Sequence, residues 1–300
     1  MIISASRRTD IPAFYSNWLL QRLRDRYCVV QNPFNPRQVT RLSLCPAEVE
    51  ALAFWTRDAR PLLPHLPELD ERGYRYFFHY TLTGYPRVFE PHTPAMSEAV
   101  ETMRRLADMI GSARVIWRYD PLLFSSLTPP AYHLEQFARL ADALHGAVHR
   151  VVSSLLANYR GVGARLARLA AQGITLHDLP PESAEFAEFM RGLSACAHAH
   201  GLEIVSCATP LDLRPFGIAA GKCLDADYLR RVFGISVAPE KDRHQRPACG
   251  CVASKDIGMY GSCLHGCVYC YATRSAEQAV NNHARHRVDC PSLLPEKFSG

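Results

Sequence analysis

The cysteines near the end of the chain are the residues whose types and spacing are best suited to chemistry. Of 11 cysteines in 300 residues, the last fifth of the chain contains Cys249, Cys251, Cys263, Cys267, Cys270 and Cys290. Cys263, Cys267 and Cys270 have the spacing C-x-x-x-C-x-x-C, which lets one tight loop place three thiolates around a [4Fe–4S] cluster and leave one iron open. Gly266 precedes the second of these cysteines and permits the positive φ that such a loop needs. The segment therefore predicts a metal site.

Two other kinds of site fit the same cysteines. The first is a structural zinc site, in which Cys249, Cys251, Cys263 and either Cys267 or Cys270 bind the ion tetrahedrally. The protein would then be a zinc-stabilised binding protein, with nucleic acid as a candidate partner. A fully ligated electron-transfer cluster would instead use Cys249, Cys251 or Cys290 as its fourth ligand. If the site is neither of these two kinds, Cys249 and Cys251 have three possible roles: they bind an auxiliary cluster, supply a thiol that acts on the substrate, or pack beside the site.

The motif Cys263-Leu264-His265-Gly266-Cys267-Val268-Tyr269-Cys270 resembles that of the radical S-adenosylmethionine (SAM) superfamily, and Tyr269-Cys270-Tyr271-Ala272 is similar to its spore photoproduct lyase branch. The resemblance implies that Cys263, Cys267 and Cys270 bind a [4Fe–4S] cluster whose open iron binds SAM. It also implies that an electron from a ferredoxin- or flavodoxin-type donor cleaves SAM to a 5′-deoxyadenosyl radical, which acts on a substrate of unknown class. Tyr269 would then lie near the adenine.

A second resemblance covers nearly the whole chain. Most radical SAM proteins carry the motif after their first strand, whereas here it follows six predicted strand–helix units. This order, together with the N-terminal segment Ser4–Pro12, Phe54-Trp55-Thr56 and Asp256-Ile257-Gly258, resembles a bacterial family known as domain of unknown function 1848. Its likeness to the radical SAM fold implies a partial barrel of six units.

Alternating strands and helices predict the elements that must position these cysteines. Apolar, β-rich runs predict strands at Ile2–Ser4, Ala51–Trp55, Tyr76–Leu82, Arg114–Arg118, Arg150–Leu155 and Glu203–Cys207, and a hairpin from Cys28–Gln31 and Gln38–Leu44. Apolar residues spaced three or four apart predict helices around residues 14–23, 100–110, 134–144 and 186–193. We therefore expect an α/β fold, a partial parallel (βα)6 TIM-like barrel over residues 1–235, and an iron–sulfur-binding loop in the C-terminal segment 236–300 of the same domain.

Polar residues follow several of the predicted strands, at the rim where barrel enzymes build their active sites. The candidates for binding SAM besides Tyr269 are Arg7, Asp10, Arg118, Asp120, Ser154 and Ser206. Arginine pairs with a carboxylate through two parallel hydrogen bonds, so Arg7 or Arg118 is the preferred partner for the carboxylate of SAM.

Composition excludes several other classes of protein. At 48% apolar and 21% charged residues the chain can bury a core, and a net charge of +5 is too weakly basic to indicate nucleic-acid binding by itself. No apolar run is long enough for a membrane helix, and Thr9-Asp10-Ile11-Pro12 follows Arg7-Arg8 where an export signal would be apolar. We expect a cytoplasmic protein with reduced thiols, in which Cys28, Cys45, Cys196, Cys207 and Cys223 belong to the core, with Cys207 nearest the rim.

Overall fold

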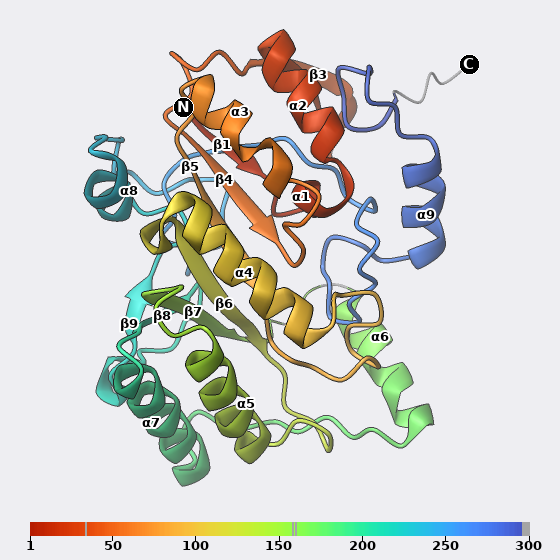
Figure 1. The fold of residues 1–300 in the computed structure, drawn as a ribbon. Coiled ribbons are helices and arrows are strands. Elements are labelled where there is room, and N and C mark those ends of the chain that lie inside the picture. The colour runs from red at the N-terminus through yellow and green to blue at the C-terminus, as the bar shows by residue number, and fades with distance from the viewer. Residues whose placement is uncertain (34, 158, 160, 296–300) are drawn as a thin grey trace. The chain divides into compact units, whose positions relative to one another are not determined.

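The computed structural model of the chain describes residues 1–33, 35–157, 159 and 161–295 (Figure 1). The chain divides into two compact units. The first contains residues Met1–Phe78, Ser254–Gly266 and Cys270–Gly300, and the second contains His79–Ala253 and Cys267–Tyr269. The cysteine motif therefore contributes residues to both units, which are described separately below.

The central sheet has eight strands in the order β10-β1-β4-β5-β6-β7-β8-β9. The pairs β10–β1, β1–β4, β6–β7, β7–β8 and β8–β9 are all parallel, so the predicted α/β class with a mostly parallel sheet is confirmed. The strands are β1 (Ile2–Ala5), β4 (Ala51–Thr56), β5 (Tyr76–Thr81), β6 (Val115–Leu122), β7 (Arg150–Leu155), β8 (Glu203–Cys207), β9 (Ala219–Gly221) and β10 (Lys255–Asp256). The short strands β9 and β10 were not predicted, because two or three residues show no periodicity.

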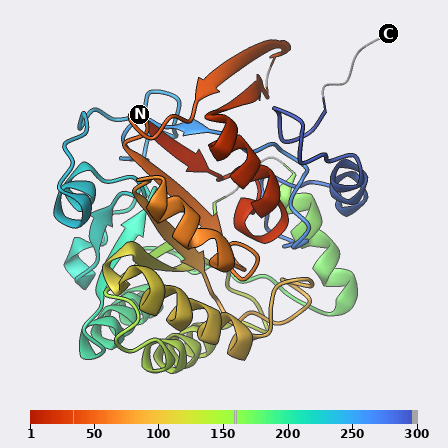
Figure 2. The same cartoon turned by 45° about the horizontal axis from the view of Figure 1, so that its top comes forward.

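In the first unit, the N-terminal and C-terminal segments of the chain share one sheet edge. β10 pairs with β1, with Ile3 opposite Lys255 and Ser4 opposite Asp256. The helices of this unit are α1 (Ile11–Phe14), α2 (Ser16–Asp25), α3 (Leu66–Glu71) and α9 (Ala276–Ala284). The predicted hairpin is present as β2 (Tyr27–Asn32) and β3 (Asn35–Ser43), an antiparallel pair that Figure 2 shows beside α2.

In the second unit, helices cover the parallel strands β6, β7 and β8 (Figure 1). They include α4 (Met96–Ile110), α5 (Pro130–Ala143) and α7 (Ala184–Ala199); the unit also contains α6 (Val162–Ala167) and α8 (Ala226–Phe233). The apolar faces predicted for α4, α5 and α7 are buried; Trp117 of β6, for example, stacks on Phe137 of α5 with ring centroids 4.8 Å apart. Burial of these faces against the strands supplies the hydrophobic stabilisation of the unit.

The structure corrects the predicted end of one strand. β6 does not stop at Arg118 but continues to Leu122, so Arg118 and Asp120 lie within the strand and not after it. The pairing of β6 with β7 shifts register between Tyr119 and Leu122, and Pro121 lies in that irregular part. A proline cannot donate to the ladder, which accounts for the irregular pairing there.

No helix among the described residues is both long and apolar enough to cross a membrane.

Candidate functional site

Contacts within the first unit hold both ends of the cysteine loop. The Tyr15 hydroxyl donates to the carbonyl of Ser262 at 2.7 Å, directly before Cys263. Burial raises the pKa of Tyr15 well above its usual range, and the neighbouring Cys263 sulfur raises it further, so the hydroxyl stays protonated as a donor. After the loop, the backbone N–H of Thr273 donates to the Cys270 sulfur at 3.4 Å.

A buried carboxylate holds the interior of the same loop. The Asp10 side chain caps α1 by accepting from the Ala13 N–H at 3.0 Å. It also accepts from the Thr56 hydroxyl at 2.8 Å, from the Arg57 N–H at 2.7 Å and from His265 Nε2 at 2.8 Å. His265 lies between Cys263 and Cys267, so Asp10 joins β4, α1 and the cysteine loop. Its predicted contact with SAM stays a prediction, while its four protein donors show a positioning role.

A second carboxylate joins β10 to the residues after β1. Asp256 accepts from the Ser4 hydroxyl at 2.8 Å, the Ser6 hydroxyl at 2.7 Å, the Arg7 N–H at 2.9 Å and the Gly258 N–H at 3.0 Å. Gly258 packs so closely that a Cβ there would lie 2.1 Å from the Ser6 hydroxyl oxygen. The sequence Asp256-Ile257-Gly258 is therefore explained by hydrogen bonding and close packing at this point.

The Arg7 guanidinium contacts other groups of the first unit. It lies over the Trp55 ring at 4.8 Å, and its Nη1 donates to the Ser254 hydroxyl at 3.3 Å. The Arg7 carbonyl accepts from the Tyr271 hydroxyl at 2.6 Å, which attaches the residue after Cys270 to the segment after β1. Arg7 thus belongs to the framework of the cysteine loop, and its pairing with a ligand carboxylate stays a prediction.

In the second unit, the short stretch Cys267–Tyr269 is held by a buried glutamate that sequence reasoning missed. Both the Tyr269 hydroxyl and the Thr83 hydroxyl donate to Glu90 Oε1, the latter at 2.7 Å. The Val268 N–H donates to the Phe89 carbonyl at 3.0 Å. Tyr269 is buried, and its ring meets the Tyr85 ring edge-on. These contacts fix the Tyr269 side chain, and its predicted contact with adenine stays a prediction. Nothing local to Phe89-Glu90-Pro91 signals this role.

Arg118, Asp120 and Ser154 form one polar group in the second unit. Arg118 Nη2 pairs with Asp120 Oδ2 at 2.5 Å, and the Ser154 hydroxyl donates to Asp120 Oδ1. Burial alone would lower the pKa of Arg118, but the Asp120 carboxylate and nearby thiols outweigh it and raise that pKa above its ordinary value. Arg118 is therefore a permanent buried cation. Ser206 is also buried and donates to the Ala219 carbonyl at 3.3 Å. The structure brings Arg118, Asp120 and Ser154 together, and their predicted contact with SAM stays a prediction.

Three of the five cysteines expected in the core, Cys28, Cys207 and Cys223, are buried there, and two are not. Cys45 and Cys196 are only partly buried, so they are not core residues, whereas Cys28 is buried as predicted. Cys207 and Cys223 are buried with their sulfurs 3.0 Å apart. The sequence offered no signal for this pair, because they lie on different elements with no recognisable spacing.

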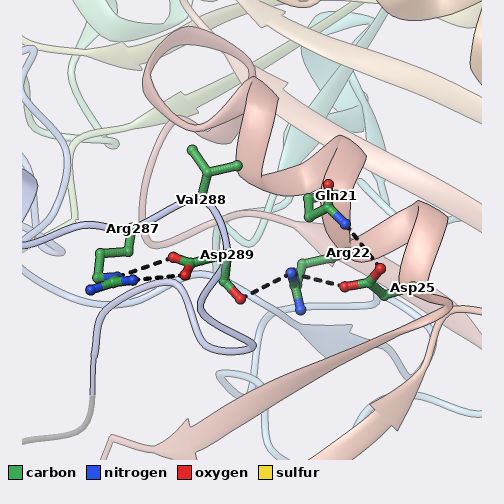
Figure 3. Close-up of a pocket in the computed structure, with 6 residues that line it drawn as sticks. All are labelled: Gln21, Arg22, Asp25, Arg287, Val288 and Asp289. Carbon is green, nitrogen blue, oxygen red and sulfur yellow. Dashed lines mark hydrogen bonds and ion pairs between the residues drawn. The ribbon is translucent and has the colours of Figure 1, made fainter.

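A surface pocket of about 500 Å³ lies between α2 and the C-terminal segment of the first unit (Figure 3). Gln21, Arg22, Asp25, Arg287, Val288 and Asp289 line it. Arg22 pairs with Asp25 at 3.0 Å and Arg287 with Asp289 at 2.7 Å, so its charged groups neutralise one another. The lining includes no cysteine and none of the residues predicted to bind SAM.

The donor set of the motif suits a thiophilic metal. Cys263, Cys267 and Cys270 form no disulfide bonds, and each residue is partly exposed. Gly266 has φ 71°, the left-handed conformation expected for the tight loop. Among the described residues, no three His, Cys, Asp or Glu side chains already converge on a metal position. Binding therefore requires the thiol side chains to turn towards a shared ion.

These features define an α/β protein with a mostly parallel sheet and a C-terminal cysteine-rich loop that is joined by hydrogen bonds to residues following β1. A family model described as Domain of unknown function (DUF1848) matches residues 2–272, and the chain belongs to this family. No curated protein matches the chain.

Proposed function

We propose that the protein is a radical SAM enzyme that binds a [4Fe–4S] cluster through Cys263, Cys267 and Cys270. The observation that carries this proposal is the C-x-x-x-C-x-Y-C spacing of three partly exposed cysteines on a loop with a left-handed glycine. When bound, the cluster would supply the electron that splits SAM into methionine and a 5′-deoxyadenosyl radical.

The chain's own residues would bind and orient the cofactor. Asp10 and Tyr15 position the motif through His265 and Ser262. Tyr269, with its hydroxyl fixed on Glu90, presents its ring for the adenine, and Arg7 or Arg118 binds the SAM carboxylate. Asp10, Asp120, Ser154 and Ser206 complete the proposed polar set. The proposed architecture is the partial (βα)6 barrel, closed by the cysteine loop, with a ferredoxin- or flavodoxin-type protein as electron donor in the cytoplasm.

Anaerobic reconstitution tests this proposal. We expect about four irons and four sulfides per chain, a change in the electron paramagnetic resonance spectrum of the reduced cluster on adding SAM, and release of 5′-deoxyadenosine with a strong reductant. Replacing Cys263, Cys267 or Cys270 with alanine should remove the cluster. The matched control, Cys45→Ala, replaces another partly buried thiol and should retain it.

The same variants distinguish the two other interpretations. A fully ligated cluster would show no spectral response to SAM and would be lost when its fourth ligand among Cys249, Cys251 and Cys290 is replaced. A zinc site shared by Cys249, Cys251 and the motif cysteines would give a colourless protein without iron uptake. Either result would refute the radical SAM proposal.

A further inference from the structure

Four cysteines outside the three-cysteine motif meet in the second unit. Cys207 ends β8, Cys223 follows β9, and Cys249 and Cys251 flank Gly250 in the segment before β10. The Cys207 and Cys223 sulfurs are 3.0 Å apart, the Cys223 thiol hydrogen-bonds with that of Cys251, and Cys251 in turn hydrogen-bonds with Cys249. We call these four residues the tetrathiol cluster.

Two hydrogen-bond donors point at sulfurs of the tetrathiol cluster, as they would at thiolates. A buried free cysteine usually behaves as a small apolar group. Here Arg118 Nη1 donates to the Cys223 sulfur at 2.9 Å, and the Leu224 N–H donates to the Cys251 sulfur at 3.4 Å. A charged donor and a backbone donor aimed at sulfur both stabilise negative charge on it.

Burial makes negative charge at this place expensive unless a cation compensates it. All four cysteines are at most 8% exposed, so water contributes little to solvating their thiolates. Arg118 supplies one positive charge, but it is also paired with Asp120. Forming several thiolates here would therefore require a further cation among the sulfurs.

The backbone brings the sulfur-bearing segments unusually close. A Cβ on Gly221, two residues before Cys223, would lie 2.5 Å from Val205 Cγ2 on β8. A Cβ on Gly250 would lie 3.2 Å from Lys222 Cγ. Glycine at both positions thus allows the three segments to approach, which is how the four thiols come within reach of one another.

The four thiols do not already surround a metal position, but the spacing of one pair is close to what a small metal ion needs. Zinc–sulfur bonds of about 2.3 Å in a tetrahedron put the sulfurs about 3.8 Å apart, whereas a disulfide requires about 2.05 Å. The 3.0 Å between the Cys207 and Cys223 sulfurs lies between these values. If side-chain rotation moved each sulfur by less than about 1 Å, the pair would reach the tetrahedral distance. Loss of the thiol protons would favour this movement, because two thiolates repel each other.

We propose that Cys207, Cys223, Cys249 and Cys251 form a second metal site, a tetrathiolate centre for zinc or iron that is separate from the C-x-x-x-C-x-x-C motif. Binding is balanced as four thiols plus one divalent cation giving one tetrathiolate complex and four protons, with no change in oxidation state. Arg118 donates to one of the coordinating sulfurs and offsets the negative charge of the complex. The site does not depend on the proposed radical SAM function, because it uses none of the three motif cysteines.

The test is metal analysis of the full chain in which Cys263, Cys267 and Cys270 are all replaced by alanine. We expect this variant, purified anaerobically, to retain about one equivalent of zinc or iron. Elemental analysis and the visible spectrum distinguish these occupants. Adding Cys207→Ser and Cys223→Ser should remove the metal, and adding Cys28→Ser and Cys45→Ser as the matched control should not.

A second measurement guards against a variant that fails to fold. Cobalt(II) bound to the triple-alanine chain should show sulfur-to-cobalt charge-transfer absorption whose intensity matches four thiolates, and its addition should release protons. Absence of metal and of cobalt binding in the folded triple-alanine chain would overturn the proposal. So would a Cys207–Cys223 disulfide found by mass spectrometry in the anaerobic protein. If the motif binds no cluster but the tetrathiol cluster still holds metal, only the radical SAM proposal fails.

Discussion

Replacement of Asp10 by asparagine tests whether this carboxylate holds the cysteine loop. Oδ1 accepts from the Ala13 N–H and the Thr56 hydroxyl, and Oδ2 accepts from the Arg57 N–H and His265 Nε2. The amide nitrogen of asparagine must replace one of these oxygens. Thr56 can rotate its hydroxyl and His265 can change tautomer, but a backbone N–H cannot adapt, so either orientation leaves one buried N–H without an acceptor.

The expected loss of unfolding free energy follows from the number of hydrogen bonds that each substitution removes from Asp10. A hydrogen bond to a charged group contributes about 1.5–3 kcal/mol, so Asp10→Asn should lower the free energy of unfolding by about that amount. Asp10→Ala leaves all four donors without their acceptor. Because each buried donor without an acceptor costs about 1 kcal/mol or more, Asp10→Ala should lower the free energy of unfolding by about 4 kcal/mol. A double-mutant cycle between Asp10→Ala and His265→Ala should give a coupling energy of about 1 kcal/mol or more.

Urea unfolding followed by tryptophan fluorescence measures these changes, because Trp18 is buried in the same unit. Asp212→Asn is the matched control: Asp212 also pairs with a basic side chain, Arg214, but on the exposed surface, so the midpoint should not move. A stability change below about 0.5 kcal/mol for Asp10→Asn would refute the positioning role. If the proposed function holds, Asp10→Asn should also lower iron retention after reconstitution.

Three further predictions concern other buried groups. Gly258→Ala should destabilise the protein by about 1–3 kcal/mol in urea unfolding, because its Cβ would overlap the Ser6 side chain; an unchanged midpoint would contradict this packing. Burial lowers the pKa of His133 to about 4, so between about pH 6.5 and pH 4 the unfolded chain binds a proton that the folded chain does not. The free energy of unfolding should therefore be highest above pH 6.5 and should fall by up to about 1.4 kcal/mol per pH unit between pH 6.5 and pH 4. His133→Gln should flatten this acid slope, and an equal slope in both proteins would contradict the assignment. Tyr269→Phe should cost about 1–3 kcal/mol, because Glu90 loses one of its two hydroxyl donors; a neutral effect in urea unfolding would argue against that contact.

Local patterns were enough to predict much of the fold. The buried faces of α4, α5 and α7, the β2–β3 hairpin and the six long strands of the sheet all follow from apolar spacing over a few residues. Helical and strand periods are local properties of the chain, so a single sequence displays them. The spacing of Cys263, Cys267 and Cys270 is local in the same sense, and it alone indicated the kind of metal chemistry to expect.

Contacts between distant parts of the chain were decided only by the tertiary structure. Asp256 joins Ser4 across 252 positions, His265 joins Asp10 across 255, and Glu90 meets Tyr269 across 179. The same holds for the tetrathiol cluster, in which Cys207 and Cys223 looked like ordinary core residues until the fold brought them to Cys251 and Cys249. No periodicity links such residues, because the parallel sheet brings them together by aligning strands from distant parts of the chain. The amino-acid sequence by itself thus determined which thiols could chelate metal as one loop, and the packing of the strands determined which carboxylates hold that loop and which other thiols meet.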